Sequence, residues 1–315
     1  MNYKNKSVLV TGATGLVGSH LTRKLVDLGA DVTILVRDYI HNSELRRSGY
    51  FDKVNRVYGD VRDYKMLERA IGEHEVSIVF HLAAQTIVPI ANRNPLSTFD
   101  TNVMGTANLL EACRRAPLVE RIIVASSDKA YGDNGKAAYV ESTPLNGEHP
   151  YDVSKSAQDL IALAYGHSYE MSIAVSRCGN IYGAGDLNWS RLIPGTIRRL
   201  LTNQRPMIYG NGKMLRDYFY VGDCADSYLL LGASKEVGAF NFSGGEPMTT
   251  IEVVDLIQKV MGTNVANEFI GTNNEIDSQW LDSSKAKEKL GFKPEHTLET
   301  GLVETVEWYK GILNV

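Results

Sequence analysis

Apolar and polar positions follow two patterns along the first 183 residues of the chain. Short runs rich in β-branched residues are typical of buried strands, and longer stretches carry apolar residues at helical spacing. The expected strands are 7–12, 31–36, 76–84, 120–127 and 171–183, and the expected helices are 18–29, 64–74, 99–116 and 150–169. Strands that alternate with helices form right-handed βαβ units, which build a parallel sheet covered on both faces. The pattern therefore predicts an α/β fold with a doubly wound parallel sheet.

The alternation changes beyond about residue 184, where loops, one helix and short extended pieces are mixed. We therefore expect a first domain over 1–183 and a smaller C-terminal α/β lobe built from 184–216 and 246–315. Residues 217–245 are expected to return to the first domain, because "AFNFSGG" (239–245) has the pattern of a further sheet strand. A cleft is expected between the two parts.

Composition and charge narrow the classes of partner and compartment. The chain has 315 residues, of which 43% are apolar and 22% charged, and its net charge is −4. This charge provides no attraction for nucleic acid or an anionic membrane, so neither is expected as a partner. Cys113, Cys178 and Cys224 are widely spaced and form no CxxC pair, which predicts buried thiols and no disulfide framework or metal site. Without a signal-peptide pattern or a run of about 18 apolar residues, the protein is expected to be cytoplasmic.

The segment "VTGATGLVGSHL" places three glycines, Gly12, Gly15 and Gly18, between the first expected strand and the first expected helix. Glycines at such a turn let the backbone approach a ligand closely, and the helix N-terminus presents free N–H groups and a positive dipole end. This spacing, in this context, predicts a Rossmann-like domain that binds the pyrophosphate of a dinucleotide. The loop residues expected to contact the cofactor are Gly12, Thr14, Gly15, Leu16 and Val17.

The end of the second expected strand, "ILVRDY", leaves the type of dinucleotide open. An acid there, such as Asp38, binds the ribose 2′-hydroxyl of NAD, whereas an arginine such as Arg37 suits the 2′-phosphate of NADP. A solvated pair of charges at the strand end is the third interpretation. A further expected strand lies between 31–36 and the helix at 64–74, and Asp60, in "GDVRD" after this strand, is placed to meet the adenine edge.

Tyr151 and Lys155, in "YDVSK", are four residues apart and therefore share one face of the expected helix. An ammonium group beside a phenol lowers the phenol's pKa, which makes a tyrosinate available as a base near neutral pH. Such a pair alone is common on helix surfaces. Here it follows a glycine-rich turn and a strand that ends in serine, so we interpret it as a catalytic base and its partner.

With these features, the chain resembles the extended short-chain dehydrogenase/reductase family, and within it the nucleotide-sugar epimerases and dehydratases. The similar motifs run in the family's order through nearly the whole chain. They are "TGATGLVGSHL", "GDVRD", "HLAAQ", "TNVMGTANLLEAC", "SSDKAYG", "PYDVSK", "RCGNIYG", "LRDYFYVGD" and "LGFKP" with "LETGLVETVEWY".

The resemblance implies a tightly bound NAD(P) cofactor, a nucleotide-diphosphate sugar as the partner, and a homodimer formed through the helices at 99–116 and 150–168. Ser127 matches the residue that hydrogen-bonds the sugar 4-hydroxyl, Tyr151 the base that removes its proton, and Lys155 the lysine that binds the cofactor ribose. Asn180 and Arg216 match residues that hold the substrate diphosphate, with a structural ion pair as the alternative for Arg216. Further cofactor contacts implied are Val61, Leu82, Ala83, Ala84 and Asn102, and further substrate contacts are Gln85 and Arg191.

Asp128 and Lys129, in "SSDKAYG", concern the reaction that follows the C4 oxidation common to both groups of enzymes. Epimerases of the family usually carry small or uncharged residues after the serine or threonine. A 4,6-dehydratase needs an acid and a base near C5 and C6 of the sugar. The Ser-Asp-Lys sequence is similar to that of CDP-glucose 4,6-dehydratases, which implies that Asp128 protonates the departing C6 hydroxyl and Lys129 takes the C5 proton.

The prediction is therefore a nucleotide-sugar 4,6-dehydratase of the CDP-glucose or GDP-mannose type, and other interpretations stay open. The pair of charges is also interpretable as a solvated salt bridge in a loop. A 4-epimerase remains an alternative, because "TGLVGSHL" departs from the Phe-Lys-Gly-Ser-Trp usual in CDP-glucose dehydratases. An NADPH-dependent keto-sugar reductase shares the same serine, tyrosine and lysine.

Overall fold

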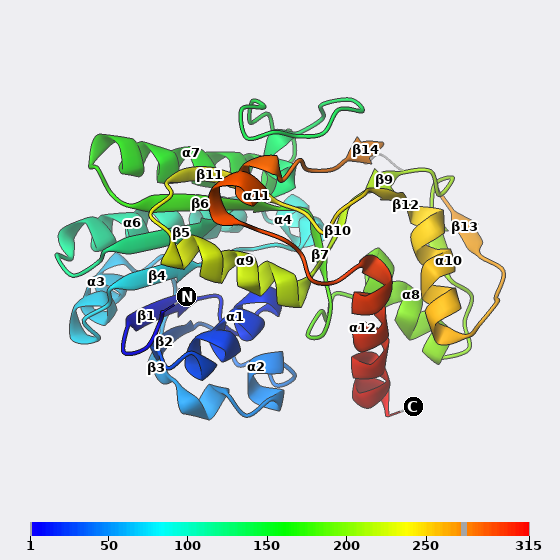
Figure 1. The fold of residues 1–315 in the computed structure, drawn as a ribbon, viewed down its shortest axis with the longest axis horizontal. Helices are drawn as coiled ribbons and strands as arrows, with labels where there is room; N and C mark the ends of the chain where they lie inside the picture. The colour runs from blue at the N-terminus through cyan, green and yellow to red at the C-terminus, as the bar shows by residue number, and fades with distance from the viewer. Residues whose placement is uncertain (1, 272–275, 315) are drawn as a thin grey trace.

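Seven parallel strands form the central sheet of the molecule, in the spatial order β11-β6-β5-β4-β1-β2-β3 (Figure 1). The computed structural model describes residues 2–271 and 276–314. The strands are β1 (Ser7–Thr11), β2 (Asp31–Val36), β3 (Asn55–Tyr58), β4 (Ile78–His81), β5 (Arg121–Ala125), β6 (Ile173–Cys178) and β11 (Gly238–Phe242). The order reverses between β1 and β4, and ligands of such sheets bind at the carboxyl ends of the strands near this point. The predicted doubly wound parallel sheet is confirmed.

Helices cover both faces of this sheet, and each face has its own hydrophobic core (Figure 1). The first face carries α1 (Leu16–Asp27) and α9 (Val221–Ala233), and the second carries α3 (Tyr64–Glu73), α6 (Gly105–Arg115) and α7 (Pro150–Ser168). Leu21 and Tyr228 belong to the first core, and Leu109 and Ala162 to the second. Because both faces are covered, the central strands β1, β2, β4 and β5 consist mainly of apolar residues, whereas the edge strand β3 is mostly exposed.

Shorter helical elements connect these layers and shape the edge of the sheet where its strands end. They are α2 (Glu44–Arg47), η1 (Phe51–Lys53), α4 (Val88–Arg93), α5 (Pro95–Phe99), η2 (Asp100–Met104) and η3 (Asp128–Tyr131). The helix expected over 99–116 is interrupted, because η2 is a π-helical turn that precedes α6. π-helical turns of this kind often occur at functional sites.

The C-terminal lobe is a layer of helices beside short strands, to the right of the sheet in Figure 1. Its helices are α8 (Leu192–Leu201), α10 (Thr250–Met261) and α12 (Leu298–Leu313). Ile197, Val253 and Leu302 form part of the core between them. A capping box of Thr249 and Glu252 begins α10.

Small sheets join the lobe to the carboxyl edge of the main sheet. β9 (Leu215–Arg216) lies between β12 (Met248–Thr249) and β14 (Ser278–Gln279), β7 (Asn180–Tyr182) pairs with β10 (Tyr218–Tyr220), and β8 (Met207–Tyr209) pairs with β13 (Glu268–Ile270). Each of these strands has only two or three residues, which is too short for a periodic pattern to reveal it.

One segment differs from the predicted division of the chain. Residues 246–315 were expected in the lobe, but α11 (Ser284–Leu290) packs against β11 of the main sheet. Phe292, which follows this helix, meets the rings of Phe219 and Phe242 edge-on at centroid distances of 5.8 and 5.0 Å. This aromatic contact holds the segment on the main sheet. Among the helices of the described residues, none is long and apolar enough to cross a membrane.

Candidate active site

Two glycines that have no room for a side chain shape the turn between β1 and α1. Gly12 has a φ of +73°, and a Cβ atom there would lie 2.7 Å from backbone atoms of Leu82 and Ala83 at the end of β4. A Cβ atom on Gly18 would lie 2.1 Å from the carbonyl oxygen of Gly12. The helix therefore begins this close to the turn only because both positions are glycine.

The N-terminus of α1 has no side-chain cap. Gly15 is the N-cap residue, and the first N–H groups of a helix have no partner within the helix. Together with the positive dipole end, these groups bind an anion such as a pyrophosphate. The turn thus fits the pyrophosphate of a dinucleotide. Thr14, Leu16 and Val17 belong to the same turn and first helical residues, and their cofactor contacts stay a prediction.

The end of β2 carries a pair of opposite charges. Arg37 Nε donates to Asp38 Oδ2 at 2.6 Å, and both side chains are more than half exposed. A hollow of about 340 Å³ lies beside them, lined in part by Tyr39, Arg46 and Tyr58. Because the pair neutralises itself, its net charge does not favour NAD over NADP. The choice of dinucleotide therefore stays open at this strand end.

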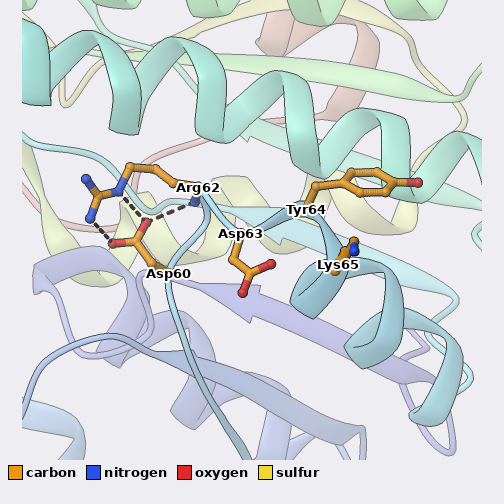
Figure 2. Close-up of a pocket in the computed structure, with 5 residues that line it drawn as sticks. All are labelled: Asp60, Arg62, Asp63, Tyr64 and Lys65. Carbon is orange, nitrogen blue, oxygen red and sulfur yellow. Dashed lines mark hydrogen bonds and ion pairs between the residues drawn. The ribbon is translucent and has the colours of Figure 1, made fainter.

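Asp60 lies after β3 in a second hollow of about 620 Å³, which Arg62, Asp63, Tyr64 and Lys65 also line (Figure 2). Its carboxylate accepts hydrogen bonds from the backbone N, Nε and Nη2 of Arg62 at 2.9, 3.0 and 2.9 Å. Burial acts to raise the pKa of Asp60, but these hydrogen bonds outweigh it, and the net pKa lies below its ordinary value. Asp60 is therefore an anion held in a defined position, beside the predicted adenine site.

Buried hydrogen bonds fix the loop that follows β4, where three of the predicted cofactor contacts (Leu82, Ala83 and Ala84) lie. Thr11 Oγ1 accepts from the backbone N of Ala83 at 3.1 Å and lies 2.8 Å from His81 Nδ1. Burial lowers the pKa of His81 to about 3, and the nearby Lys155 charge acts in the same direction. His81 is therefore a neutral structural group at physiological pH.

Asn102 joins this loop to α7. Its side chain lies in the π-helical turn, is fully buried, and accepts from the backbone N of Gln85 at 2.7 Å. Its amide group donates to the carbonyl of Gln85 at 3.1 Å and to Ser154 Oγ at 2.9 Å. All of these bonds fix the position of α7 relative to the loop. A cofactor contact of Asn102 and a substrate contact of Gln85 stay predictions, as does the cofactor contact of Val61, which is buried after Asp60.

Tyr151 and Lys155 lie in the first turns of α7 and are 8% and 3% exposed. Lys155 Nζ donates to the carbonyl of Ala125 and to Gln158 Oε1, both at 2.8 Å. Burial lowers the pKa of Lys155 to about 8. Burial also raises the pKa of Tyr151, and a hydrogen bond with Ser127 offsets part of this effect. The lowered phenol pKa expected from the sequence is therefore wrong for the chain alone, because burial dominates.

Ser127, Asp128 and Lys129 form one compact turn at the carboxyl end of β5. Ser127 is the N-cap of η3, and its Oγ accepts from the backbone N of Lys129 at 3.2 Å. The same hydroxyl donates to Asp128 Oδ1 at 3.0 Å. Asp128 is only 3% exposed, and its other carboxylate oxygen has no hydrogen-bond partner within the described residues. The structure thus brings a serine, a carboxyl group and an amine together beside Tyr151.

A buried cluster of aromatic and charged side chains fixes the position of this turn. The ring of Tyr131 stacks on that of Tyr139 at 4.9 Å, and its hydroxyl donates to Asn241 Oδ1 at 2.7 Å. Arg177 donates to the Tyr131 hydroxyl at 2.8 Å and forms a buried ion pair with Asp159 at the same distance. The position of the turn of Ser127, Asp128 and Lys129 is therefore set by residues from β6, α7 and β11.

Two residues of this region have no counterpart in the sequence prediction. Gln279 of β14 contacts both Asp128 and Lys129 through its amide. Asp217 is 1% exposed and accepts from the backbone N of Leu281 at 3.1 Å. Burial raises the pKa of Asp217 to about 7, and the charge of Asp128 acts in the same direction. Gln279 lies in a strand too short to give any sequence signal, whereas the adjacent Arg216 was the only pointer to Asp217.

The remaining predicted substrate residues lie around β7, β9 and the start of α8. Asn180 Nδ2 donates to the carbonyl of Asp217 at 3.3 Å, so Asn180 is adjacent to the strand that carries Arg216. Arg216 is 4% exposed and donates to the carbonyl of Ile276 at 2.6 Å. Arg191 forms an ion pair with Asp186 at 2.7 Å. Their contacts with a substrate stay predictions.

Comparison with known proteins places the whole chain in one family. The GDP-mannose 4,6-dehydratase family model matches residues 9–305. The CDP-glucose 4,6-dehydratase of Salmonella typhimurium is 32% identical over 98% of this chain and 91% of its own length. A putative UDP-glucose 4-epimerase of Methanocaldococcus jannaschii is 33% identical over 96% of this chain and 98% of its own length.

The fold is equally similar to that of solved members. The dTDP-glucose 4,6-dehydratase of Streptomyces venezuelae, solved with NAD bound, has a TM-score of 0.89 and 29% identity, with 97% of each chain covered. The predicted resemblance and the class of cofactor are thereby confirmed. The chain belongs to the GDP-mannose 4,6-dehydratase family, whose relatives here are NAD-dependent nucleotide-sugar dehydratases and epimerases with the short-chain dehydrogenase/reductase type of fold.

Proposed function

We propose that this enzyme is a nucleotide-sugar 4,6-dehydratase, which converts an NDP-hexose to the NDP-4-keto-6-deoxyhexose. The observation that carries the proposal is the turn of Ser127, Asp128 and Lys129. Asp128 bonds to Ser127 and Lys129 bonds to Gln279, so the two charged groups do not form the solvated salt bridge that the sequence left open. Epimerisation at C4 requires no second acid and base, whereas dehydration does.

The first step is oxidation at C4. A bound nicotinamide supplies the hydride acceptor and, later, the hydride donor. Tyr151 takes the proton of the 4-hydroxyl as a phenolate, the form that burial disfavours in the chain alone. Ser127, whose hydroxyl hydrogen-bonds the phenol, orients the sugar 4-hydroxyl. Lys155, with a pKa of about 8, is mostly protonated at neutral pH and provides a cation one helical turn from Tyr151.

The second step removes water across C5 and C6. The 4-keto group acidifies the C5 hydrogen, and Lys129 Nζ takes this proton as an unprotonated amine. The electron pair of the C5–H bond forms the C5–C6 double bond, and the C6–O bond breaks. Asp128, as a carboxylic acid, protonates the departing hydroxyl, which leaves as water. Return of hydride to C6 and a proton to C5 completes the 4-keto-6-deoxy product.

The proposed substrate is CDP-glucose, because the relative that acts on it, by its name, is 32% identical along almost the whole chain. A second candidate is 4-epimerisation of UDP-glucose, which the name of the 33% identical relative favours. The two candidates differ in one chemical outcome, since only the dehydratase loses the C6 hydroxyl.

The test is incubation in D₂O with CDP-glucose, GDP-mannose, UDP-glucose or dTDP-glucose, followed by NMR of the products. We expect a 4-keto-6-deoxy sugar from CDP-glucose, with deuterium at C5. A C4-inverted sugar that retains its C6 hydroxyl would show that the enzyme is an epimerase. Net consumption of NADPH would indicate the keto-sugar reductase.

A substitution tests the role of Lys129. Lys129→Met is expected to reduce dehydration by about 100-fold or more, the usual contribution of a positioned base. Oxidation at C4, seen as reduced-cofactor absorbance, should persist because Tyr151 and Lys155 are untouched. Lys136→Met, in the exposed loop after the catalytic turn, is the matched control and should behave as the unmodified enzyme. Normal dehydration by Lys129→Met would contradict the assigned role.

We also propose a cytoplasmic homodimer with a resident cofactor. Leu96, Met104 and Leu160 lie in or beside the expected dimer helices and are 71%, 52% and 56% exposed, which supports a covered face. All three cysteines are free and buried, as expected of a reducing compartment. Light scattering should give twice the chain mass, and mass spectrometry of the denatured protein should identify the released NAD or NADP.

A further inference from the structure

Gln279 reaches the catalytic turn from a distant part of the chain. It lies in β14, is fully buried, and pairs in register with Arg216 of β9. Lys129 is 150 residues away in sequence. Nothing in the proposed chemistry uses Gln279, so its burial against two reacting groups requires an explanation.

Both ends of the Gln279 amide are bonded to this turn. Its Nε2 donates to the carbonyl oxygen of Asp128 at 3.3 Å, and its Oε1 accepts from Lys129 Nζ. These two bonds also fix the orientation of the amide, because only its oxygen accepts and only its nitrogen donates. One side chain therefore sets the position of both the backbone of Asp128 and the amine of Lys129.

The segment around Gln279 is itself anchored to the loop that follows the turn. Tyr139 donates its backbone N to the carbonyl of Trp280, and Asp282 donates its backbone N to the carbonyl of Tyr139, both at 2.9 Å. Leu281 N donates to Asp217 at 3.1 Å. Gln279 thus contacts Lys129 from a fixed backbone rather than from a mobile loop.

We propose that Gln279 is a positioning residue, which holds Lys129 Nζ in place for removal of the C5 proton and does so without stabilising its ammonium form. An amide oxygen accepts one N–H of a neutral amine and leaves the nitrogen lone pair available for a proton. A carboxylate at the same place favours the charged amine, which is inactive as a base. This inference rests on the proposed function, since it assigns Lys129 as the C5 base.

The charged surroundings of Lys129 make the neutrality of Gln279 significant. Acidic side chains already lie near Lys129 in the turn itself, in α7 and in the connection between β9 and β10. Titratable and charged groups interact here from each neighbouring element. They are Asp128, Tyr139, His149, Tyr151, Asp152, Arg191, Arg216 and Asp217. Burial raises the net pKa of Asp152, and the nearby Lys129 acts in the opposite direction. The two side chains therefore interact electrostatically. A carboxylate in place of Gln279 adds a negative charge at hydrogen-bonding distance from the Lys129 amine.

Two substitutions separate positioning from charge. Gln279→Met removes both hydrogen bonds at nearly constant side-chain volume. We expect kcat for dehydration to fall between about 10-fold and 100-fold, because a displacement of the base by about 1 Å lowers the rate by up to about 100-fold. Gln279→Glu keeps an acceptor but adds charge, and we expect the acid limb of the kcat profile to move up by about one pH unit or more. KM should change little in both variants.

A second measurement follows Lys129 directly and needs no turnover. The pH dependence of reductive methylation at Lys129, read by mass spectrometry of the holoenzyme, reports the pKa of its amine. Gln279→Glu should raise this midpoint by the same amount as the acid limb. Gln258→Glu, at a buried glutamine of α10 that bonds to Val265, is the matched control and should shift neither.

The outcomes distinguish the inference from the proposed function. A C4-inverted product from the unmodified enzyme overturns the dehydratase, whereas the methylation midpoint of Lys129 still tests the contact with Gln279. A 4-keto-6-deoxy product with unchanged pH limbs and midpoints in Gln279→Glu overturns the positioning role. A merely structural role predicts that Gln279→Met loses C4 oxidation and dehydration to the same extent, and this result also refutes the inference.

Discussion

Asp217 provides a test of how burial controls charge near the turn of Ser127, Asp128 and Lys129. Its carboxyl group is 1% exposed, and burial raises its pKa from 3.8 to about 7. The folded chain thus holds this proton more tightly than the unfolded chain. Stability is therefore greatest at low pH, falls as the pH rises from about 4 to about 7, and is constant above that range.

The size of the effect follows from the shift. Each pH unit between the two pKa values changes the free energy of unfolding by about 1.4 kcal/mol, so the ionised carboxylate costs about 4 kcal/mol above pH 7. Asp217→Asn removes this cost and keeps an oxygen that accepts from Leu281 N. We expect the variant to be more stable than the parent at pH 8, with an advantage that shrinks by about 1.4 kcal/mol for each unit from pH 7 to pH 5.

Urea unfolding followed by circular dichroism at several pH values between 5 and 8.5 measures this difference. Asp282→Asn provides a control of opposite sign, because hydrogen bonds from Ser284 hold the pKa of Asp282 below its ordinary value. A pH-independent difference between Asp217→Asn and the parent would refute the reasoning. It would mean that the carboxylate is solvated or paired in the folded state.

Two further substitutions test the glycine-rich turn before α1, which we propose binds the cofactor, and the support of the turn of Ser127, Asp128 and Lys129. Gly18→Ala places a Cβ atom 2.1 Å from the carbonyl oxygen of Gly12, so α1 must move away from the turn. The amount of nucleotide released on denaturation, measured by mass spectrometry, should therefore fall well below one per chain. A full complement of nucleotide in that variant would contradict this account of the turn. Arg177→Met leaves the fully buried Asp159 without its partner and should cost about 3–5 kcal/mol in urea unfolding, and a loss below about 1 kcal/mol would show that the pair is dispensable.

Local features of the chain carried much of the prediction. The glycines at 12, 15 and 18 act through a single turn between neighbouring elements, and Tyr151 and Lys155 are one helical turn apart. For these residues, the spacing along the sequence therefore determines their distance in the structure. The buried strands were equally visible, because a sheet covered on both faces requires continuous apolar runs.

Contacts between distant segments were not visible in this way. Gln279 and Asp217 lie in or beside strands of two or three residues, which have no periodicity. Gln279 contacts the turn of Ser127, Asp128 and Lys129 from a distant part of the chain, and the charge of Asp128 acts on Asp217. The pKa of Tyr151 was predicted in the wrong direction for a related reason. Its neighbours along the helix suggested a nearby cation, but its pKa depends mainly on how completely other elements exclude water from it.

The type of fold and the dinucleotide turn thus follow from the order of residues, since short-range geometry and apolar periodicity specify them. The candidate reacting groups followed from the resemblance of the motifs. The environment of Ser127, Asp128 and Lys129 does not. Burial of Asp128, the amide contact with Lys129 and the raised pKa of Asp217 all come from segments up to 150 residues away, and their free energies depend on desolvation. Desolvation is a property of the packed molecule, so the surroundings of this turn are decided only by the tertiary structure.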